Sequence, residues 1–277
     1  MKEVARGAFA IVLTASDTWT PETVAIKRFR KNRHGDEANR EAAYLSRLSH
    51  ANVVTYLWRR EHGPFIDIGL EYCLHGSVES ILRNTDLKER LDNAFCGAPT
   101  TKPDSVARCA KSHLPELLIA DFLRQVLEGL SYIHCEDIVH CDVKAANILV
   151  QAGGICKIAD FNQAWSSGSP LTHGRTPIRG SAQWMAPEVK SQTAIGTSAD
   201  IWSLGCFTIE MLTGTLPHPE CTSQEQALFK RDPPRVPGFA GQRLKETILS
   251  MLTVVPQERP SARELLRRTC LDPVDAL

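Results

Sequence analysis

Short hydrophobic runs rich in β-branched and aromatic residues occupy the first 72 positions of the chain and predict β-strands. Turn-forming residues separate these runs, such as the His-Gly-Pro at 62–64. The predicted strands cover 10–15, 23–30, 53–57 and 65–72. Hydrophobic residues between the second and third strands recur at helical spacing over 37–48, which predicts one helix within this β-rich segment.

After Gly76 the spacing of hydrophobic residues becomes helical. The strongest stripe runs from Leu117 to His134, and shorter stripes follow at 200–212, 244–252 and 262–268. A β-rich segment followed by a helical one predicts an α+β fold of two lobes with a cleft between them. The predicted single domain covers 1–277, with an N-lobe at 1–72, a hinge at 73–76 and a C-lobe at 77–277.

Residues 84–115 interrupt the helical pattern. This stretch contains one glycine, three prolines and two cysteines and has little periodicity. We interpret it as a surface insertion. A docking site for a partner protein is one hypothesis for this insertion, and a tolerated loop is the simpler alternative.

The overall charge argues against a nucleic-acid-binding protein, because 32 Lys+Arg balance 32 Asp+Glu. No hydrophobic stretch approaches the ~20 residues that a membrane span requires. The apolar run at 8–13 is short and strand-like, and Glu3 lies in the flank that a signal peptide would keep basic. We therefore predict a cytoplasmic protein and leave the nucleus open.

The nine cysteines are scattered and form no CxxC pair, which favours reduced thiols over a disulfide framework. Two His-Cys pairs, at 134–135 and 140–141, offer four zinc ligands within a short stretch. Their spacing matches no tetrahedral template, so a structural zinc site is disfavoured.

Four separate stretches carry the residues most indicative of chemistry. They are Val24-Ala25-Ile26-Lys27, His140-Cys141-Asp142-Val143-Lys144-Ala145-Ala146-Asn147, Asp160-Phe161-Asn162 and Met185-Ala186-Pro187-Glu188. Each alone is a weak signal. In this order and at these separations they resemble the signatures of the protein kinase family, V-A-I-K, H-R-D-x-K-x-x-N, D-F-G and A-P-E. The resemblance extends from about Val4 to about Arg268 and implies the two-lobed kinase fold.

The resemblance also implies catalytic roles in transferring the γ-phosphoryl group of ATP to a protein hydroxyl. Lys27 would contact the α- and β-phosphates. Glu41 would steer it, because residues 41–50 match the family pattern E-x-x-x-L-x-x-L-x-H. Asp142 would accept or orient the proton of the substrate hydroxyl, and Lys144 would lie against the transferring phosphate.

Two further residues would hold magnesium, whose preference for hard oxygen ligands suits the amide of Asn147 and the carboxylate of Asp160. Other positions would bind the nucleotide, through apolar contacts with adenine, a glycine near the phosphates and backbone groups of the hinge. These positions are Val4, Gly7, Val12, Ala25, Leu70, Glu71, Cys73 and Leu149. Glu188 and Arg259 would form the family's buried ion pair, and Asp200 would brace the catalytic loop.

Three departures from the family pattern stand out. Only Gly7 remains of the glycine-rich loop, so ATP affinity is in doubt. Asn162 replaces the glycine of D-F-G, and we expect asparagine to preserve a positive φ there. Cys141 replaces the arginine that pairs with a phosphate on the activation segment, residues 163–185. A thiol cannot supply that charge-assisted contact. We therefore expect activity without phosphorylation at the candidate sites, Thr172, Thr176 and Ser181.

The resemblance favours a serine/threonine kinase, because Lys144 lies two residues after Asp142. The run from Gly180 to Glu188 is similar to the G-T-x-x-W-M-A-P-E of the STE group, which includes the mitogen-activated protein kinase kinase kinases, and implies a signalling cascade. ATP, magnesium and a protein substrate are the expected ligands. A pseudokinase scaffold with weak nucleotide binding remains the main alternative, supported by Ala5 and Ala10 in the eroded loop and by Cys141 and Asn162. A small-molecule or lipid kinase is disfavoured by the Ala-Pro-Glu segment.

Overall fold

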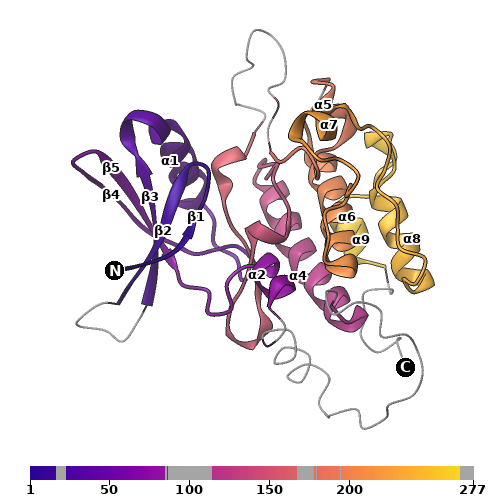
Figure 1. The fold of residues 1–277 in the computed structure, drawn as a ribbon, viewed down its shortest axis with the longest axis horizontal. Helices are drawn as coiled ribbons and strands as arrows, with labels where there is room; N and C mark the ends of the chain where they lie inside the picture. The colour runs from indigo at the N-terminus through magenta and orange to yellow at the C-terminus, as the bar shows by residue number, and fades with distance from the viewer. Residues whose placement is uncertain are drawn as a thin grey trace.

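The computed structural model describes residues 1–16, 23–84, 86, 114–166, 178, 180–193 and 195–268. Most of the predicted insertion at 84–115 and the candidate phosphorylation sites Thr172 and Thr176 lie outside the described residues. In the described part, an N-terminal sheet region lies beside a helical C-terminal region (Figure 1). The predicted two-lobed α+β fold class is therefore confirmed.

The N-terminal region is a five-stranded antiparallel sheet in the order β1-β2-β3-β5-β4. Its strands are β1 (Lys2–Arg6), β2 (Ala10–Ser16), β3 (Thr23–Arg30), β4 (Tyr56–His62) and β5 (Phe65–Glu71). Strand β3 lies in the middle, so Lys27 is opposite Val12 on one side and Ile68 on the other. The register therefore places a lysine at the centre of the sheet.

Helix α1 (Lys31–Leu45) packs on this sheet. It starts earlier and ends earlier than the predicted helix at 37–48. The first turn carries no apolar stripe and is kinked at His34, where φ is −136°, so periodicity could not show it. Beyond the end at Leu45, Leu48 is still buried by the following turn, which extended the apparent stripe.

The strand predicted at 53–57 is shifted in the structure to β4. Val53 and Val54 lie before the strand, where Val53 forms an isolated bridge with Ile158 and the N–H of Val54 donates to the carbonyl of Ile158 (2.9 Å). Their burial reflects contact with the C-terminal region. The true strand is a polar edge strand, which lacks the alternation that the prediction relied on.

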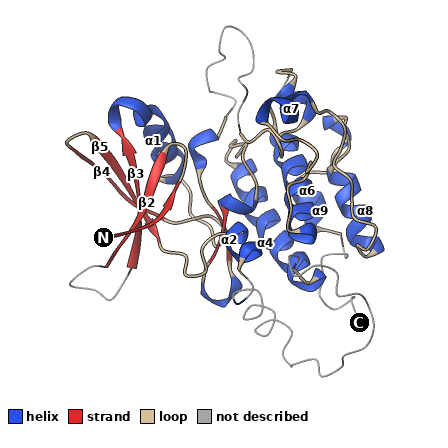
Figure 2. Cartoon of the chain, in the orientation of Figure 1, coloured by secondary structure: helices blue, strands red, loops and turns tan. Residues whose placement is uncertain are grey.

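The C-terminal region is built around two long helices, α4 (Glu116–Cys135) and α6 (Thr197–Thr213), which pack against each other (Figure 2). The other helices that the structure describes there are α2 (Val78–Arg83), α5 (Pro187–Lys190), α7 (Gln224–Phe229), α8 (Gln242–Met251) and α9 (Ala262–Leu266). Within the described residues, no helix combines the length and hydropathy needed to span a membrane.

A two-stranded antiparallel sheet, β6 (Ile148–Val150) and β7 (Cys156–Ile158), follows α4 in the C-terminal region and is accompanied by short 3₁₀ turns. These turns are η1 (Ala145–Asn147), η2 (Ala152–Gly154) and η3 (Phe161–Gln163), and a fourth, η4 (Pro256–Glu258), lies near the C-terminus. Turn η3 packs against α1. This contact connects the N-terminal region to the site described next.

Helix α6 is buried over almost its whole length and supports the loop that precedes η1. Near its start, both carboxylate oxygens of Asp200 accept backbone N–H groups, from His140 and from Cys141, each at 2.8 Å. Arg259 forms a two-point ion pair with Glu188 at 2.6 and 2.7 Å. The contacts of Asp200 fix the backbone just before Asp142 without involving its side chain.

Candidate active site

Three charged side chains from distant parts of the chain are in direct contact. The Nζ of Lys27 on β3 lies 2.9 and 2.7 Å from the two carboxylate oxygens of Glu41 on α1. The same nitrogen lies 2.7 Å from Oδ1 of Asp160, just before η3. Lys27 is 8% exposed and Glu41 is fully buried. The structure thus brings together residues separated by as many as 133 positions.

Electrostatics tie these three groups to one another. Burial alone would lower the pKa of Lys27, but the carboxylates of Asp160 and Glu41 outweigh it and raise this pKa above its usual value. Burial raises the pKa of Glu41, and the nearby ammonium only partly offsets this increase. For Asp160, burial opposes ionisation, yet Lys27 holds the pKa below its ordinary value. The lysine is therefore kept charged although it is buried.

Asp142 lies at the centre of a second cluster. Its Oδ2 accepts hydrogen bonds from the Nζ of Lys144 and from the Nδ2 of Asn147, both at 2.8 Å. Its Oδ1 accepts one from the backbone N–H of Ser181 at 2.9 Å. A carboxylate has about four acceptor sites, so Asp142 retains capacity to accept a proton from a further hydroxyl.

Backbone conformation helps to orient the carboxylates of Asp142 and Asp160. Cys141 and Asp160 have positive φ values of 66° and 67°. Asn162 is not among the residues with positive φ, so the expectation that it preserves such a conformation is wrong. It lies inside η3, and the left-handed residue of this turn is Asp160. The side chain of Asn162 is instead buried, and its Oδ1 has no hydrogen-bond partner within the described structure.

The donor set fits a magnesium ion. Asn147 uses its amide nitrogen to donate to the backbone carbonyl and to Oδ2 of Asp142, which leaves its oxygen as the available atom. Asp160 uses Oδ1 for Lys27, and its second oxygen takes part in no hydrogen bond or ion pair with a described residue. An amide oxygen and a carboxylate oxygen are the hard ligands that Mg²⁺ prefers.

Most of the predicted nucleotide-contacting residues lie on strands of the N-terminal sheet or on β6. Val12 and Ala25 lie on neighbouring strands, and Ala25 is opposite Leu70 on β5. Leu149 on β6 is opposite Lys157 and forms an isolated bridge with Ser77. Val4 is 49% exposed and lies at a β-bulge in β1. These positions surround the strand that carries Lys27 or lie just after η1.

The remaining predicted positions lie at turns. Gly7 joins β1 to β2, and its N–H donates to the carbonyl of Ala10 at 2.9 Å. Glu71 ends β5, and its carboxylate pairs with Lys157 at 2.8 Å. Burial raises the pKa of the Cys73 thiol to about 12, which keeps it neutral. The backbone N–H of Cys73 has no partner among the described residues, which leaves it available to a ligand.

The histidines of the two His-Cys pairs make other contacts. Nε2 of His134 lies 2.9 Å from Oδ2 of Asp200, and Nε2 of His140 lies 3.0 Å from the carbonyl oxygen of Ala159. Within the described residues there is no cluster of three or more side chains that could hold a metal through His, Cys, Asp and Glu. The magnesium pair above includes an asparagine and so is a different kind of site.

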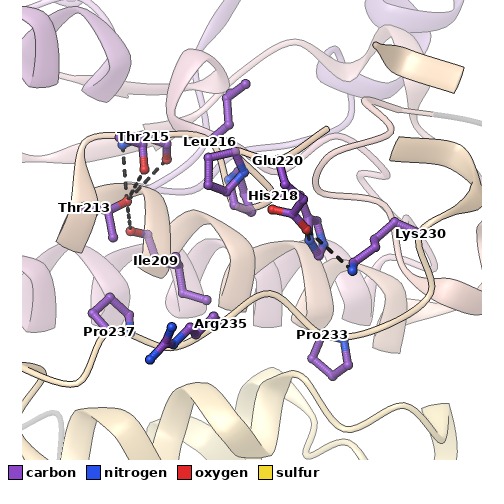
Figure 3. Close-up of a pocket in the computed structure, with 12 residues that line it drawn as sticks. Ile209, Thr213, Thr215, Leu216, His218, Glu220, Lys230, Pro233, Arg235 and Pro237 are labelled. Atoms are coloured by element: carbon purple, nitrogen blue, oxygen red, sulfur yellow. Dashed lines mark hydrogen bonds and ion pairs between the residues drawn. The ribbon is translucent and has the colours of Figure 1, made fainter. Parts of the chain in front are cut away.

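A separate pocket of about 450 Å³ lies at the far end of α6 (Figure 3). Prolines and the aliphatic side chains of Ile209 and Leu216 form much of its wall, and an ion pair between Glu220 and Lys230 borders it. It contains none of the predicted site residues, because Asp200 and the catalytic loop lie at the opposite end of the helix.

Comparison with known proteins agrees with this geometry. The family described as protein kinase domain matches residues 1–271. The chain belongs to the protein kinase family. This assignment confirms the resemblance and the fold class that the motifs predicted.

Three relatives of this kinase domain are themselves named as protein kinases. It is 35% identical to the mitogen-activated protein kinase kinase kinase MST11 of Pyricularia oryzae, over 98% of the chain and 29% of that protein. It is 38% identical to the serine/threonine-protein kinase STE11 of Saccharomyces cerevisiae, over 86% of the chain and 30% of that protein. The mitogen-activated protein kinase kinase kinase ANP1 of Arabidopsis thaliana is 32% identical over 95% of the chain and 38% of its own length. The chain therefore spans about a third of these relatives.

The sequence did not predict the contacts that three residues make near the candidate site. Arg40 donates from Nη1 to the carbonyl of Asn162 at 3.0 Å, and an arginine beside Glu41 had no distinguishing pattern. Ser181 was considered only for phosphorylation, yet its hydroxyl lies 2.5 Å from Nζ of Lys144. Glu210 is a buried acid that accepts from the backbone N–H of Ala145 and from Nε1 of Trp184. A glutamate within the apolar run of α6 was the available signal for this residue.

Proposed function

We propose that this domain is an ATP- and magnesium-dependent protein serine/threonine kinase. The observation that carries the proposal is the position of Lys27, whose buried ammonium is held by the carboxylates of Glu41 and Asp160. A triphosphate needs a charged group that is already positioned, because phosphoryl transfer depends mainly on positioning and charge stabilisation. The ion pair with Glu41 provides this without a further conformational change.

In the proposed mechanism, Lys27 binds the α- and β-phosphates of ATP. Asn147 and Asp160 would hold magnesium, which would supply positive charge to neutralise the phosphate oxygens. Asp142 accepts the proton of the attacking hydroxyl, and Lys144 stabilises the charge on the transferred group. The hinge recognises adenine through backbone groups near Glu71 and Cys73, while Val4, Gly7, Val12, Ala25 and Leu149 contact the nucleotide.

Selectivity for serine and threonine is supported by the position of Lys144 two residues after Asp142 and by the relative named serine/threonine-protein kinase. Lys144 also contacts the hydroxyl of Ser181. This contact joins the catalytic loop to the segment leading to the Ala-Pro-Glu motif, where a substrate would lie. The relatives that are named mitogen-activated protein kinase kinase kinases support a place in such a cascade, with another protein kinase as the substrate. We further propose a cytoplasmic location. A docking role for 84–115 stays a prediction.

The pseudokinase alternative rests on the eroded glycine loop. Gly7 closes a tight turn onto Ala10, but the neighbouring alanines add methyl groups where phosphates approach. Against this alternative, the charged residues needed for transfer are present and in contact. A scaffold without catalysis has no need for a buried lysine held by two carboxylates.

The test uses purified protein with labelled ATP, magnesium and a generic basic protein, followed by phosphoamino-acid analysis. The matched control is Asp142→Asn, which keeps the shape of the side chain. We expect phosphoserine or phosphothreonine with the wild type and a loss of about 100-fold or more with the variant. Equal signals would refute the proposed role of Asp142. No signal together with a nucleotide-dependent thermal shift would favour the scaffold.

A further inference from the structure

Arg40 makes a contact that the kinase signatures do not explain. It lies on α1 immediately before Glu41, and its Nη1 donates to the backbone carbonyl oxygen of Asn162 at 3.0 Å across 122 positions. No carboxylate of a described residue lies within ion-pair distance of Arg40. The guanidinium therefore directs its charge toward a peptide carbonyl of the turn that follows Asp160.

Two features of the site give this contact importance. Asn162 is only 2% exposed and buries an amide oxygen that has no hydrogen-bond partner in the described part of the chain. Such an unpaired acceptor destabilises the observed position of the turn. At Cys141 the chain carries a thiol, whose Sγ lies 3.6 Å from the carbonyl of Val139, where an arginine would offer a cation. The catalytic loop therefore contributes no guanidinium at this position.

A second contact on the same face of α1 acts in the same direction. Tyr44 lies one helical turn after Arg40, and its hydroxyl lies 3.5 Å from the Oγ of Ser166, beyond η3. The two side chains thus contact the chain on both sides of Gln163. Helix α1 and turn η3 are packed together over this stretch.

We propose that Arg40 is a positioning residue that holds Asp160 in the orientation suited to magnesium and Lys27. Asn162 and Asp160 belong to one short turn, so a movement that takes Asp160 away from Lys27 also takes the carbonyl away from Arg40. The hydrogen bond exists only in the observed arrangement and shifts the population toward it. The kinase would thereby order its active site from α1 itself, without an activation-segment phosphate.

The first experiment measures hydrogen exchange of residues 156–166 in the nucleotide-free protein, so it does not depend on the proposed kinase activity. The variant Arg40→Met keeps the aliphatic stem and removes the donors. The matched control is Arg33→Ala, an exposed arginine on the same helix. We expect exchange about 10-fold faster in Arg40→Met, as the loss of one charge-assisted hydrogen bond implies, and unchanged exchange in Arg33→Ala.

Two further comparisons separate positioning from general stability. The α4 segment at 122–133 should exchange equally in all variants, and Arg40→Lys, which retains a donor, should resemble the wild type more than Arg40→Met does. Exchange within about twofold of wild type in Arg40→Met, or equal acceleration in α4, would overturn the proposal. Phosphatase treatment of the wild type that reproduces the Arg40→Met result would also overturn it, since Arg40 would then be holding a phosphate.

A kinetic experiment extends the proposal to catalysis and rests on the proposed function. In Arg40→Met we expect kcat to fall about 10-fold while KM for the protein substrate stays unchanged. An unchanged kcat alongside faster exchange would contradict the link between the turn and catalysis. A wild type without any transferase activity would count against the proposed function alone, because the exchange measurement stands independently.

Discussion

Ser181 offers a sharp test of how the segment before the Ala-Pro-Glu motif contributes to the site. Its backbone N–H donates to Oδ1 of Asp142 at 2.9 Å, and its hydroxyl lies 2.5 Å from Nζ of Lys144. Lys144 in turn lies 2.8 Å from Oδ2 of Asp142. The serine hydroxyl is thus a neutral third partner of the ion pair between Lys144 and Asp142, to which we assign the catalytic roles. A negative charge at this position would compete with Asp142 for the same lysine.

The magnitude follows from these distances. The Ser181 hydroxyl and the Asp142 carboxylate lie within about 5 Å of each other, and at an effective dielectric constant of about 20 two like charges at that distance repel by about 3 kcal/mol. We therefore expect Ser181→Asp to lower kcat by about 100-fold. Ser181→Ala loses only a hydrogen bond to a charged group, worth about 1.5–3 kcal/mol. Its kcat should therefore fall by at most about 10- to 100-fold.

The assay is steady-state transfer from ATP to a protein substrate, with thermal unfolding of each variant as the check on folding. Ser181→Thr is the matched control, because it keeps the hydroxyl, and should retain activity near that of the wild type. Wild-type activity in Ser181→Ala would contradict the role of the contact. Higher activity in Ser181→Asp would mean that this residue is an activating phosphorylation site, which would refute the reasoning.

Three other predictions concern the support of the site. Glu188→Ala should lower the free energy of unfolding in urea by about 3–5 kcal/mol, because it leaves Arg259 buried without its partner. Removing the exposed Glu79, which pairs with Arg83, should lower it by less than about 1 kcal/mol. Equal losses would contradict the structural role of the buried Glu188–Arg259 pair. Burial raises the pKa of Glu210 from 4.5 to about 7, so between these pH values the folded state binds a proton that the unfolded state has lost. The free energy of unfolding should therefore fall as the pH rises from 4.5 to about 7. Glu210→Gln should remove this pH dependence, which is measured as the difference in unfolding free energy between pH 5 and pH 8. The same difference in the variant as in the wild type would refute the role of Glu210. Phosphatase treatment should leave wild-type turnover within about twofold, because Cys141 offers no charged partner for a phosphate; abolished turnover would refute this.

The fold class could be predicted because each region has its own hydrophobic period. The strand carrying Lys27 and the helix α4 were found within a residue or two, since strong β-branched runs and long apolar stripes decide such elements. Element ends were less predictable. The first turn of α1 is polar and kinked, and β4 is a polar edge strand, so neither shows a periodic signal.

The charged cluster of the site could be anticipated from the resemblance, because its residues lie in ordered motifs. Contacts through the backbone could not. The bond from Arg40 reaches a carbonyl, which every residue possesses, so no residue type marks the acceptor. Gly180 shows the same limit, because its φ of 96° lets the chain pass so close to Cys141 that a Cβ would lie 2.0 Å from the carbonyl oxygen. Such approaches are determined by tertiary packing.

A crystal structure of the domain with magnesium and a non-hydrolysable ATP analogue would test the central claim most directly. We predict that the α- and β-phosphates contact Nζ of Lys27, that oxygens of Asn147 and Asp160 bind the metal, and that the γ-phosphate faces Asp142. A nucleotide bound away from Lys27, or an ordered cleft that stays empty at saturating analogue, would contradict the assignment of this site to phosphoryl transfer.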